Sequence, residues 1–422
     1  MDLTWSDSED AFRSEARTWL EANVPDPALE SGDTKDGFAA HLEWEHRLAA
    51  DRWAVVSWPE EYGGRGASLW EWLIFEEEYY RAGAPQRVTQ NGIFLLAPTI
   101  FEFGTKGQQD YYLPRMSAAV DLWCQGWSEP NAGSDLAGVR SKATRDDAAG
   151  GWVLSGQKTW TTRGAFCNYL FGLFRTDPES ERHKGLTYFM VPLDAAGVTV
   201  RGFGRLDGDE GFAEVFFDDV FIPDSEIGPD GVETAAGMAL GGILGEVNQG
   251  WGVAMATTSS ERGLTLRSPG RFQATAARLL ELAREQSTAG SSATAGSSAA
   301  ESSLGGSSAA GSSRAGISEA LANAVTDAWI DAEAYSLYTL KDVSGIVEGR
   351  SPGARSSYNK IFWSELDVRL HQVALDILGP EAEVEGPWMK GYEFALSGPI
   401  YAGTNEIQRN IVAERVLGLP RK

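Results

Sequence analysis

The chain contains few of the residues that bind metals or form disulfides. Its 422 residues include two cysteines, Cys124 and Cys167, and four histidines. Two cysteines form one disulfide at most, and the default in a reducing cytosol is two buried thiols. The histidines are scattered, and no HExxH, CxxC or paired His and Cys spacing occurs. The sequence therefore predicts no metal site.

Basic residues and long apolar runs are also scarce. The 36 Lys and Arg residues stand against 60 Asp and Glu residues, so the formal net charge is −24. Such a charge repels nucleic acids and anionic lipid surfaces. No apolar run approaches the roughly 20 residues that span a bilayer, and the first residues lack the basic and apolar regions of a signal peptide. We expect no nucleic-acid partner, no membrane partner and a cytoplasmic location.

Apolar residues are nevertheless plentiful, at 42% of the chain with 15 Trp and 18 Phe, and their periodicity changes twice. Residues 1–120 have helical spacing, residues 121–235 carry short β-rich runs, and helical spacing returns over residues 236–422. This order predicts an α+β protein with an N-terminal α-helical domain, a middle β domain and a C-terminal α-helical bundle. A chain of this length is also expected to form two or three domains.

Residues 287–316 interrupt the last domain. Of these 30 residues, 25 are Ser, Ala or Gly, and almost none has a large apolar side chain. Such a segment cannot build a core, so we predict a disordered insertion between two helices.

Two common enzyme motifs begin in the sequence and are not completed. The segment that starts at Gly126 resembles the nucleophile elbow of serine hydrolases, but Pro130 stands where the second glycine is needed. The segment that starts at Gly202 resembles a dinucleotide fingerprint, but Asp207 replaces the third glycine and a β-like run follows. A serine hydrolase and a Rossmann domain are therefore disfavoured.

Two segments of the β region have the chemistry of a site for a flat cofactor. They are GWSEPNAGSDL, residues 126–136, and SGQKTWTT, residues 155–162. Trp160 offers an aromatic face with threonine hydroxyls beside it, and the turn at Gly133 and Ser134 offers N–H groups for a phosphate or a thioester tail. Each feature alone also has a plain structural explanation, since a tryptophan in a strand is usually core and a Gly-Ser-Asp stretch is usually a turn.

Together, these segments resemble the acyl-CoA dehydrogenase family, which carries TEPxAGSD and GxKxWITN at this spacing. WPEEYGG at 58–64, FFDDVFIP at 216–223 and YAGTNEIQRNIVAERVLGLPR at 401–421 extend the resemblance over nearly the whole chain. The resemblance implies an FAD cofactor, an acyl-CoA substrate and α,β-dehydrogenation, with an electron-transfer flavoprotein as electron acceptor. The motif pattern of the chain is similar to that of bacterial acyl-CoA dehydrogenase subunits of fatty-acid and steroid side-chain catabolism.

The resemblance also implies roles for single residues around the flavin. Those expected to line the ring are Trp127, Ser128, Trp160 and Thr162. Ser134 is expected at the flavin or at the pantetheine of the substrate. Thr404 and Glu406 fall where the family contacts FAD from the start of its final helix. Both also suit capping, because Thr404 is a good N-cap and Glu406 a favourable first-turn acid.

The usual catalytic base of the family is missing. Its YEGT segment reads Tyr401–Thr404 here, with Ala402 in place of the glutamate. Some branches of the family carry the base on an earlier helix, directly before an arginine, and this chain has Glu261 and Arg262 there. We therefore expect Glu261 to be the base, with Arg262 and the Ala402 N–H on the substrate. The alternative for Glu261 is a solvated helix residue.

The part of the family pattern that holds the adenine half of FAD is also altered. Arg284 remains from the RxxFGxPIxxxQ stretch, but a Ser-rich segment follows it, and Pro380 replaces a glycine of a later Gly-rich stretch. The chain thus resembles half of a flavin site, which favours a tetramer of the α₂β₂ kind with an unlike acyl-CoA dehydrogenase subunit. An alternative is that Arg284 and Arg314 bind the pyrophosphate of FAD in a homo-oligomer.

Two other functions stay open at this point. One is a non-catalytic partner subunit that completes the flavin site of another chain and carries Ala402 because it needs no base. The other is an oxidase on the same fold, since access of oxygen cannot be deduced from the sequence.

Overall fold

The computed structural model describes residues 4–224, 242–261, 268–297, 317–350 and 353–421. The chain forms two compact units. One comprises Asp2–Arg267 and Ala402–Ile407, and the other comprises Ser268–Tyr401 and Gln408–Lys422.

The first unit begins with helices that have strong start signals and an aromatic core. The helical elements are α1 (Asp7–Asn23), α2 (Lys35–Ala50), η1 (Glu60–Tyr62), α3 (Leu69–Arg81), the π-helix η2 (Asn91–Leu96), α4 (Ala97–Phe103) and α5 (Lys106–Ser117). Ser6, Ser68 and Thr105 begin α1, α3 and α5 with capping boxes. The buried rings of Trp53 and Phe75 stack at a centroid distance of 5.4 Å. The helical secondary structure predicted for this part of the chain is confirmed.

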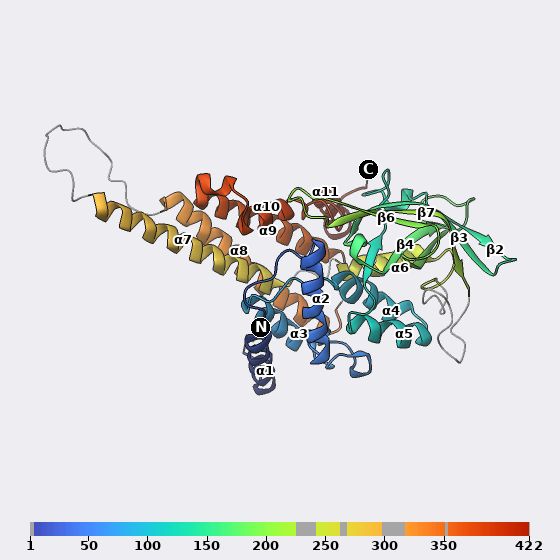
Figure 1. Cartoon of the computed structure of the whole chain (residues 1–422), viewed down its shortest axis with the longest axis horizontal. Helices are drawn as coiled ribbons and strands as arrows, with labels where there is room; N and C mark the ends of the chain where they lie inside the picture. The colour runs from blue at the N-terminus through green and yellow to red at the C-terminus, as the bar shows by residue number, and fades with distance from the viewer. Residues whose placement is uncertain (1–3, 225–241, 262–267, 298–316, 351–352, 422) are drawn as a thin grey trace. The chain divides into compact units, whose positions relative to one another are not determined.

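A seven-stranded sheet follows in the same unit (Figure 1). Its strands are β1 (Trp123–Gly126), β2 (Lys142–Asp146), β3 (Gly151–Thr162), β4 (Tyr169–Arg175), β5 (Leu186–Pro192), β6 (Val198–Phe203) and β7 (Phe212–Pro223). Short 3₁₀ turns lie at η3 (Leu136–Gly138) and η4 (Gly164–Phe166). The strand order is β1-β4-β2-β3-β7-β6, with β5 beside β4; β1 and β4 are parallel. The short β-rich runs that the sequence shows in this region form strands of this sheet.

Burial explains why β4 and β5 are almost continuously apolar. Every residue of β5 is buried, and so is every residue of β4 except its last. Strands covered on both faces do not alternate between apolar and polar residues. Helix α6 (Gly250–Glu261) belongs to the same unit and packs on β5, η2 and α4.

The second unit is helical. It contains α7 (Pro269–Ser297), α8 (Glu319–Val347), η5 (Gly353–Arg355), α9 (Ser356–Leu378), η6 (Gly379–Glu383) and α10 (Pro387–Ala395). Helix α11 (Asn405–Ile411) starts in the first unit and ends in the second, where the π-helix η7 (Val412–Val416) follows. Helices α7, α8 and α9 lie side by side and bury a core around Phe272, Ala328 and Trp363 (Figure 1).

The predicted insertion over 287–316 differs from the structure in its first part. Helix α7 continues to Ser297, so 287–297 is helical and the prediction of disorder is wrong there. Alanine is the best helix former, and the Ser287 and Thr288 hydroxyls donate to the carbonyls of Ala283 and Glu285 within the helix. The rest of the predicted insertion, 298–316, lies outside the described residues.

The order of a helical, a β and a second helical region, which the sequence predicts, is thus confirmed. None of the helices in the described ranges is both long and apolar enough to cross a membrane.

Candidate functional site

The two segments that the sequence singles out are joined to each other. The Thr159 backbone N–H donates to the Ser128 carbonyl at 2.9 Å. Next to this bond, Lys158, which precedes Thr159, donates through Nζ to Oε1 of Glu129, which follows Ser128, at 2.8 Å, and both side chains are buried. Because the Ser128 segment follows β1 while Thr159 belongs to β3, these two bonds connect strands that are not neighbours in the sheet.

The Glu129 carboxylate is held by several donors. Besides Lys158, it accepts bonds from the backbone N–H groups of Arg140 and Ser141 at 2.6 and 2.9 Å. Burial raises the pKa of Glu129, but the Lys158 charge and these hydrogen bonds outweigh burial and hold its pKa below the ordinary value. Burial lowers the pKa of Lys158 from its ordinary value, and the charge of Glu129 opposes this shift. The bonds to Glu129 fix the turn that precedes Ser134.

The residues predicted in the first segment lie in different environments. Trp127 is buried, and its indole Nε1 has no hydrogen-bond partner among the residues that the structure describes. Ser128 is half-buried, and Ser134 is exposed on the turn that follows. Just before Ser134, Glu129 and Ala132 close a turn by exchanging two backbone hydrogen bonds of 3.0 Å.

In the second segment, the backbone turns Trp160 outward. The pairing of β3 with β7 is irregular between Lys158 and Thr161, and Trp160 adopts a left-handed φ of 57°. This conformation is uncommon for a bulky residue. The indole is 60% exposed, and the edges of Phe203 and Phe212 contact it at centroid distances of 5.2 and 5.5 Å. The alternative that Trp160 is a core residue does not fit this exposure.

The end of β3 is tied to the helical region. Thr162, which is half-buried, accepts a 3.5 Å hydrogen bond on its carbonyl from the Asn91 side chain. The next residue, Arg163, donates through Nε to Asp33 at 2.7 Å, and Arg205 binds the second oxygen of that carboxylate. Burial raises the pKa of Asp33, but the two guanidinium charges outweigh it and hold that pKa below its ordinary value. This buried network was not found in the sequence, because its members are far apart.

The predicted residues of the last helix lie at its start. The Thr404 hydroxyl accepts a 3.2 Å bond from the Ile407 N–H, so it caps α11. Glu406 is exposed in the first turn. Ala402 has a left-handed φ of 55°, and Gly403 follows with a φ of 76°. The capping that the sequence allowed for Thr404 is present.

The predicted base is the last residue of α6. Helix α6 ends at Glu261, whose side chain is not described, and Arg262 lies outside the described residues. One turn before Glu261, the buried Thr257 hydroxyl lies 2.9 Å from that of Thr99 in α4 and 3.3 Å from the Tyr188 hydroxyl. Of the other expected anion contacts, Arg284 is exposed on α7 and Arg314 lies outside the described residues.

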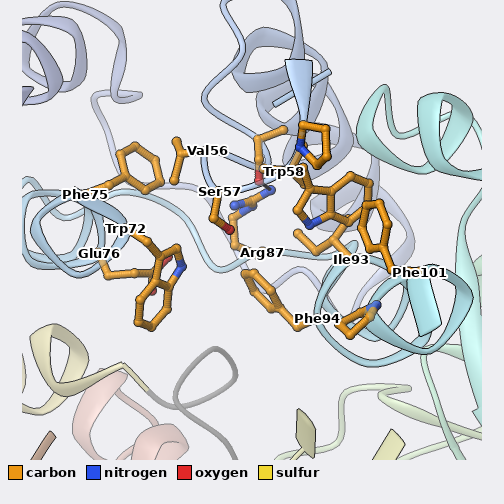
Figure 2. Close-up of a pocket in the computed structure, with 14 residues that line it drawn as sticks. Val56, Ser57, Trp58, Trp72, Phe75, Glu76, Arg87, Ile93, Phe94 and Phe101 are labelled. Carbon is orange, nitrogen blue, oxygen red and sulfur yellow. Dashed lines mark hydrogen bonds between the residues drawn. The ribbon is translucent and has the colours of Figure 1, made fainter. Parts of the chain in front are cut away.

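A cavity of about 280 Å³ lies in the helical region of the first unit (Figure 2). Most of its walls are apolar, and they come from the segment after α2 and from α3, η2 and α4. The buried Arg87 and Glu76 side chains also line it. Sequence reasoning missed these residues. The WPEEYGG segment, whose first two residues line the cavity, was the only signal near them.

Comparison with known proteins identifies the family. Three models match successive parts of the chain: the acyl-CoA dehydrogenase N-terminal domain over 6–119, the middle domain over 124–220 and the C-terminal domain over 307–417. The acyl-CoA dehydrogenases IpdE1 of Mycobacterium tuberculosis and Mycolicibacterium smegmatis are 37% and 36% identical to the chain; each match covers 97% of this chain and 98% of the relative.

Solved structures agree with this assignment. The Mycobacterium tuberculosis ChsE4-ChsE5 complex matches with a TM-score of 0.76 and 28% identity, over 100% of both chains. The Tcur3481-Tcur3483 steroid ACAD also has a TM-score of 0.76, at 24% identity and with 100% of both chains covered. The chain belongs to the acyl-CoA dehydrogenase family. It is an oxidoreductase, and FAD is the cofactor of this family.

Proposed function

We propose that this chain catalyses FAD-dependent α,β-dehydrogenation of an acyl-CoA thioester with a branched or bulky acyl group. The observation that carries the proposal is the Thr159–Ser128 hydrogen bond, which joins the two cofactor segments within one unit and leaves the Trp160 indole exposed beside them. Membership of the family supports the reaction class.

The chemistry of these segments fits an isoalloxazine ring. The ring is flat and has a polar edge, and the segments offer an exposed indole together with half-buried hydroxyls at Ser128 and Thr162. Trp127 Nε1 and Thr161 Oγ1 are buried without a hydrogen-bond partner in the described part of the chain. A buried polar atom without a partner costs about 1–3 kcal/mol, so a ligand with many heteroatoms would relieve this cost.

We assign the cofactor contacts accordingly. The residues that would hold FAD are Trp127, Ser128, Ser134, Trp160, Thr162, Thr404 and Glu406. When bound, FAD supplies the acceptor for the hydride that leaves the β-carbon of the acyl group.

The substrate contacts follow from the chemistry of the thioester. Glu261 takes the proton from the α-carbon, which is a general-base step. Removal of that proton places negative charge on the thioester carbonyl oxygen, which the Ala402 N–H would stabilise by a hydrogen bond. Arg262 and Ser134 would hold the rest of the CoA thioester. The electrons then pass to an electron-transfer flavoprotein.

We further propose that the chain works with an unlike subunit in an α₂β₂ tetramer in the cytoplasm. Two similar structures carry names of chain pairs, ChsE4-ChsE5 and Tcur3481-Tcur3483, and the second is called a steroid ACAD. The sequence supports the same arrangement, because the adenine side of the flavin site has lost its Phe-Gly and Gln positions. A second candidate, a non-catalytic partner subunit, is favoured by Ala402 alone.

The direct test is reduction of the bound flavin by substrate. The chain is purified with a co-expressed unlike acyl-CoA dehydrogenase subunit, and branched and cyclic acyl-CoA thioesters are added without oxygen. We expect loss of flavin absorbance and formation of the 2-enoyl product. A flavin-loaded complex that stays oxidised with every thioester would contradict the proposed reaction.

A further inference from the structure

Helix α6, which ends at the proposed base, has one buried side. Its buried positions recur every three or four residues, and they are Gly250, Val253, Ala254, Thr257 and Thr258. An α-helix turns by about 100° per residue, so these positions share one side and the exposed Gly252 lies on the opposite side. Position 261, the last of the helix, continues the buried side, which packs on β5, η2 and α4.

The start of α6 is fixed by a close approach to β5. A Cβ atom at Gly250 would lie 2.5 Å from the Tyr188 backbone nitrogen and 2.6 Å from the Thr187 carbonyl carbon, so only glycine lets the two backbones meet there. Just before the helix, the Leu244 N–H donates to the Tyr188 carbonyl at 3.0 Å. One anchor of α6 is therefore the backbone of β5.

A second anchor lies two turns later and consists of three hydroxyl groups. Thr257 Oγ1 lies 2.9 Å from Thr99 Oγ1 of α4 and 3.3 Å from the Tyr188 hydroxyl of β5. All three residues are at most 1% exposed. We call Thr99, Tyr188 and Thr257 the hydroxyl cluster. It joins α6 to two other elements of the first unit through side chains.

The contact between the two threonines adds to bonds within their own helices. Thr99 Oγ1 lies 3.0 Å from the Leu95 carbonyl, and Thr257 Oγ1 lies 3.1 Å from the Val253 carbonyl, four residues earlier in each case. A hydroxyl has one proton and two lone pairs, so one threonine donates to the other while the second donates to its carbonyl. A satisfied buried network of this kind fixes one arrangement of the packed elements.

The hydroxyl cluster also leads toward the proposed flavin site. Leu95, whose carbonyl faces Thr99, belongs to η2, and at the other end of η2 the Asn91 side chain donates to the Thr162 carbonyl at 3.5 Å. These residues all lie in the first unit. One short helix thus connects α6 with the end of β3. The proposed reaction requires the base and the flavin to meet one substrate in a fixed geometry, and small displacements there are costly.

We infer that the hydroxyl cluster fixes the rotation of α6 and thereby positions the proposed base, Glu261, relative to the flavin segment. Thr99, Tyr188 and Thr257 are positioning residues. They act through α6 and do not themselves take the α-proton. The inference rests on the proposed function, and it adds residues on which the rate of proton removal depends.

The test separates proton removal from hydride transfer. In cyclohexylthioacetyl-CoA a sulfur atom replaces the β-carbon, so the thioester has no β-hydride to lose. Its α-hydrogens can still exchange with deuterated water, because the base removes a proton and returns a deuteron. Exchange is followed by NMR on the flavin-loaded complex with the unlike subunit. Calorimetry gives the Kd of the same thioester, and stopped-flow absorbance gives the rate of flavin reduction by cyclohexylpropanoyl-CoA.

Substitutions of the two threonines should change the rates and leave binding as it is. Thr257→Val keeps the shape of the side chain and removes the hydroxyl, and we expect exchange and flavin reduction to slow by about 10- to 100-fold at unchanged Kd. Thr257→Ser keeps the hydroxyl and should restore the wild-type rates. Thr99→Val should also slow both rates. The double valine variant should be no slower than Thr257→Val, because both substitutions break the same contact.

The matched control is Thr339→Val in α8. Thr339 is also buried, and its hydroxyl donates to the Tyr335 carbonyl four residues earlier in the same helix, at 2.9 Å. This variant removes the same kind of hydroxyl from the second unit and should keep the wild-type rates. Should Thr257→Val not fold, Thr99→Val carries the test from the α4 side.

The outcomes separate the inference from the proposed function. Exchange that is as fast in Thr257→Val and Thr99→Val as in the wild type overturns the role of the hydroxyl cluster and leaves the proposed function intact. Slow exchange in Thr257→Ser, or losses that add in the double variant, also overturn the inference. A wild-type complex that neither exchanges α-hydrogens nor reduces its flavin overturns the proposed function together with the inference.

Discussion

Lys158 and Glu129 form a buried ion pair whose Nζ–Oε1 distance is 2.8 Å, and this pair holds together the two segments that we propose bind the cofactor. Lys158 also donates to the Leu173 carbonyl at 2.7 Å, so its ammonium group links three parts of the sheet region. Lys158 and Glu129 are 29 residues apart in sequence. Their neighbours Thr159 and Ser128 are joined by the backbone bond on which the proposed flavin site depends.

Removing the lysine should therefore destabilise the first unit. In Lys158→Met the Glu129 carboxylate stays buried without its cation, and we expect a loss of about 3–5 kcal/mol in the free energy of unfolding. Urea unfolding followed by tryptophan fluorescence measures the change. Adding Glu129→Gln should recover part of the loss. In the control, Lys106→Met breaks an exposed pair with Asp110 and should change the free energy of unfolding much less.

Asp33 gives a prediction about pH. Because Arg163 and Arg205 hold its pKa in the folded state below the ordinary value of about 3.9, Asp33 stabilises the fold above that pH. This contribution is lost as the pH falls through the folded-state pKa. We expect Asp33→Asn to lower the melting temperature at pH 7, with the difference from wild type shrinking below about pH 4. A constant difference across this range would contradict the assignment, and the exposed Asp36→Asn serves as the control.

Glu261→Gln tests the proposed base. The amide keeps the shape of the side chain and loses its basicity, so flavin and acyl-CoA should still bind while reduction of the flavin slows by about 10²–10⁴-fold or more. Stopped-flow absorbance measures this rate. The exposed Glu246→Gln should react like the wild type. Flavin bleaching in Glu261→Gln at the wild-type rate would place the base elsewhere.

The content of flavin tests the need for an unlike partner. On the side of the flavin ring, the residues expected from the family resemblance are present. On the adenine side, the Phe-Gly and Gln positions of the family pattern are lost. A homodimer repeats this deficit at both sites by symmetry. We expect the chain alone to lose FAD on gel filtration and the complex with an unlike subunit to retain it stoichiometrically, as measured by the ratio of flavin to protein absorbance. One tightly bound FAD per chain in a homo-oligomer would refute the half-site hypothesis.

Several features could be predicted from the sequence because they depend on local chemistry. Capping boxes at Ser6, Ser68 and Thr105 mark helix starts, and the apolar runs of β4 and β5 mark buried strands. The error over 287–297 has the same origin. Its lack of large side chains excludes a core, but Ala and a preceding stable helix are sufficient for α7 to continue.

The sequence by itself determined the order of the regions, the chemistry of the two segments proposed to bind the cofactor, and the family, since each depends on contiguous residues. Tertiary structure alone decided which of these residues meet. The outward turn of Trp160 depends on an irregular pairing of β3 with β7, and the Asp33–Arg163 pair joins residues 130 positions apart. The place of Arg87 in an aromatic cavity depends on three helical elements, α3, η2 and α4, and on the segment after α2. The spacing of apolar residues in a sequence reports the secondary structure of one segment. These contacts join residues far apart in the chain, and they form only when the packing of the whole unit closes long loops.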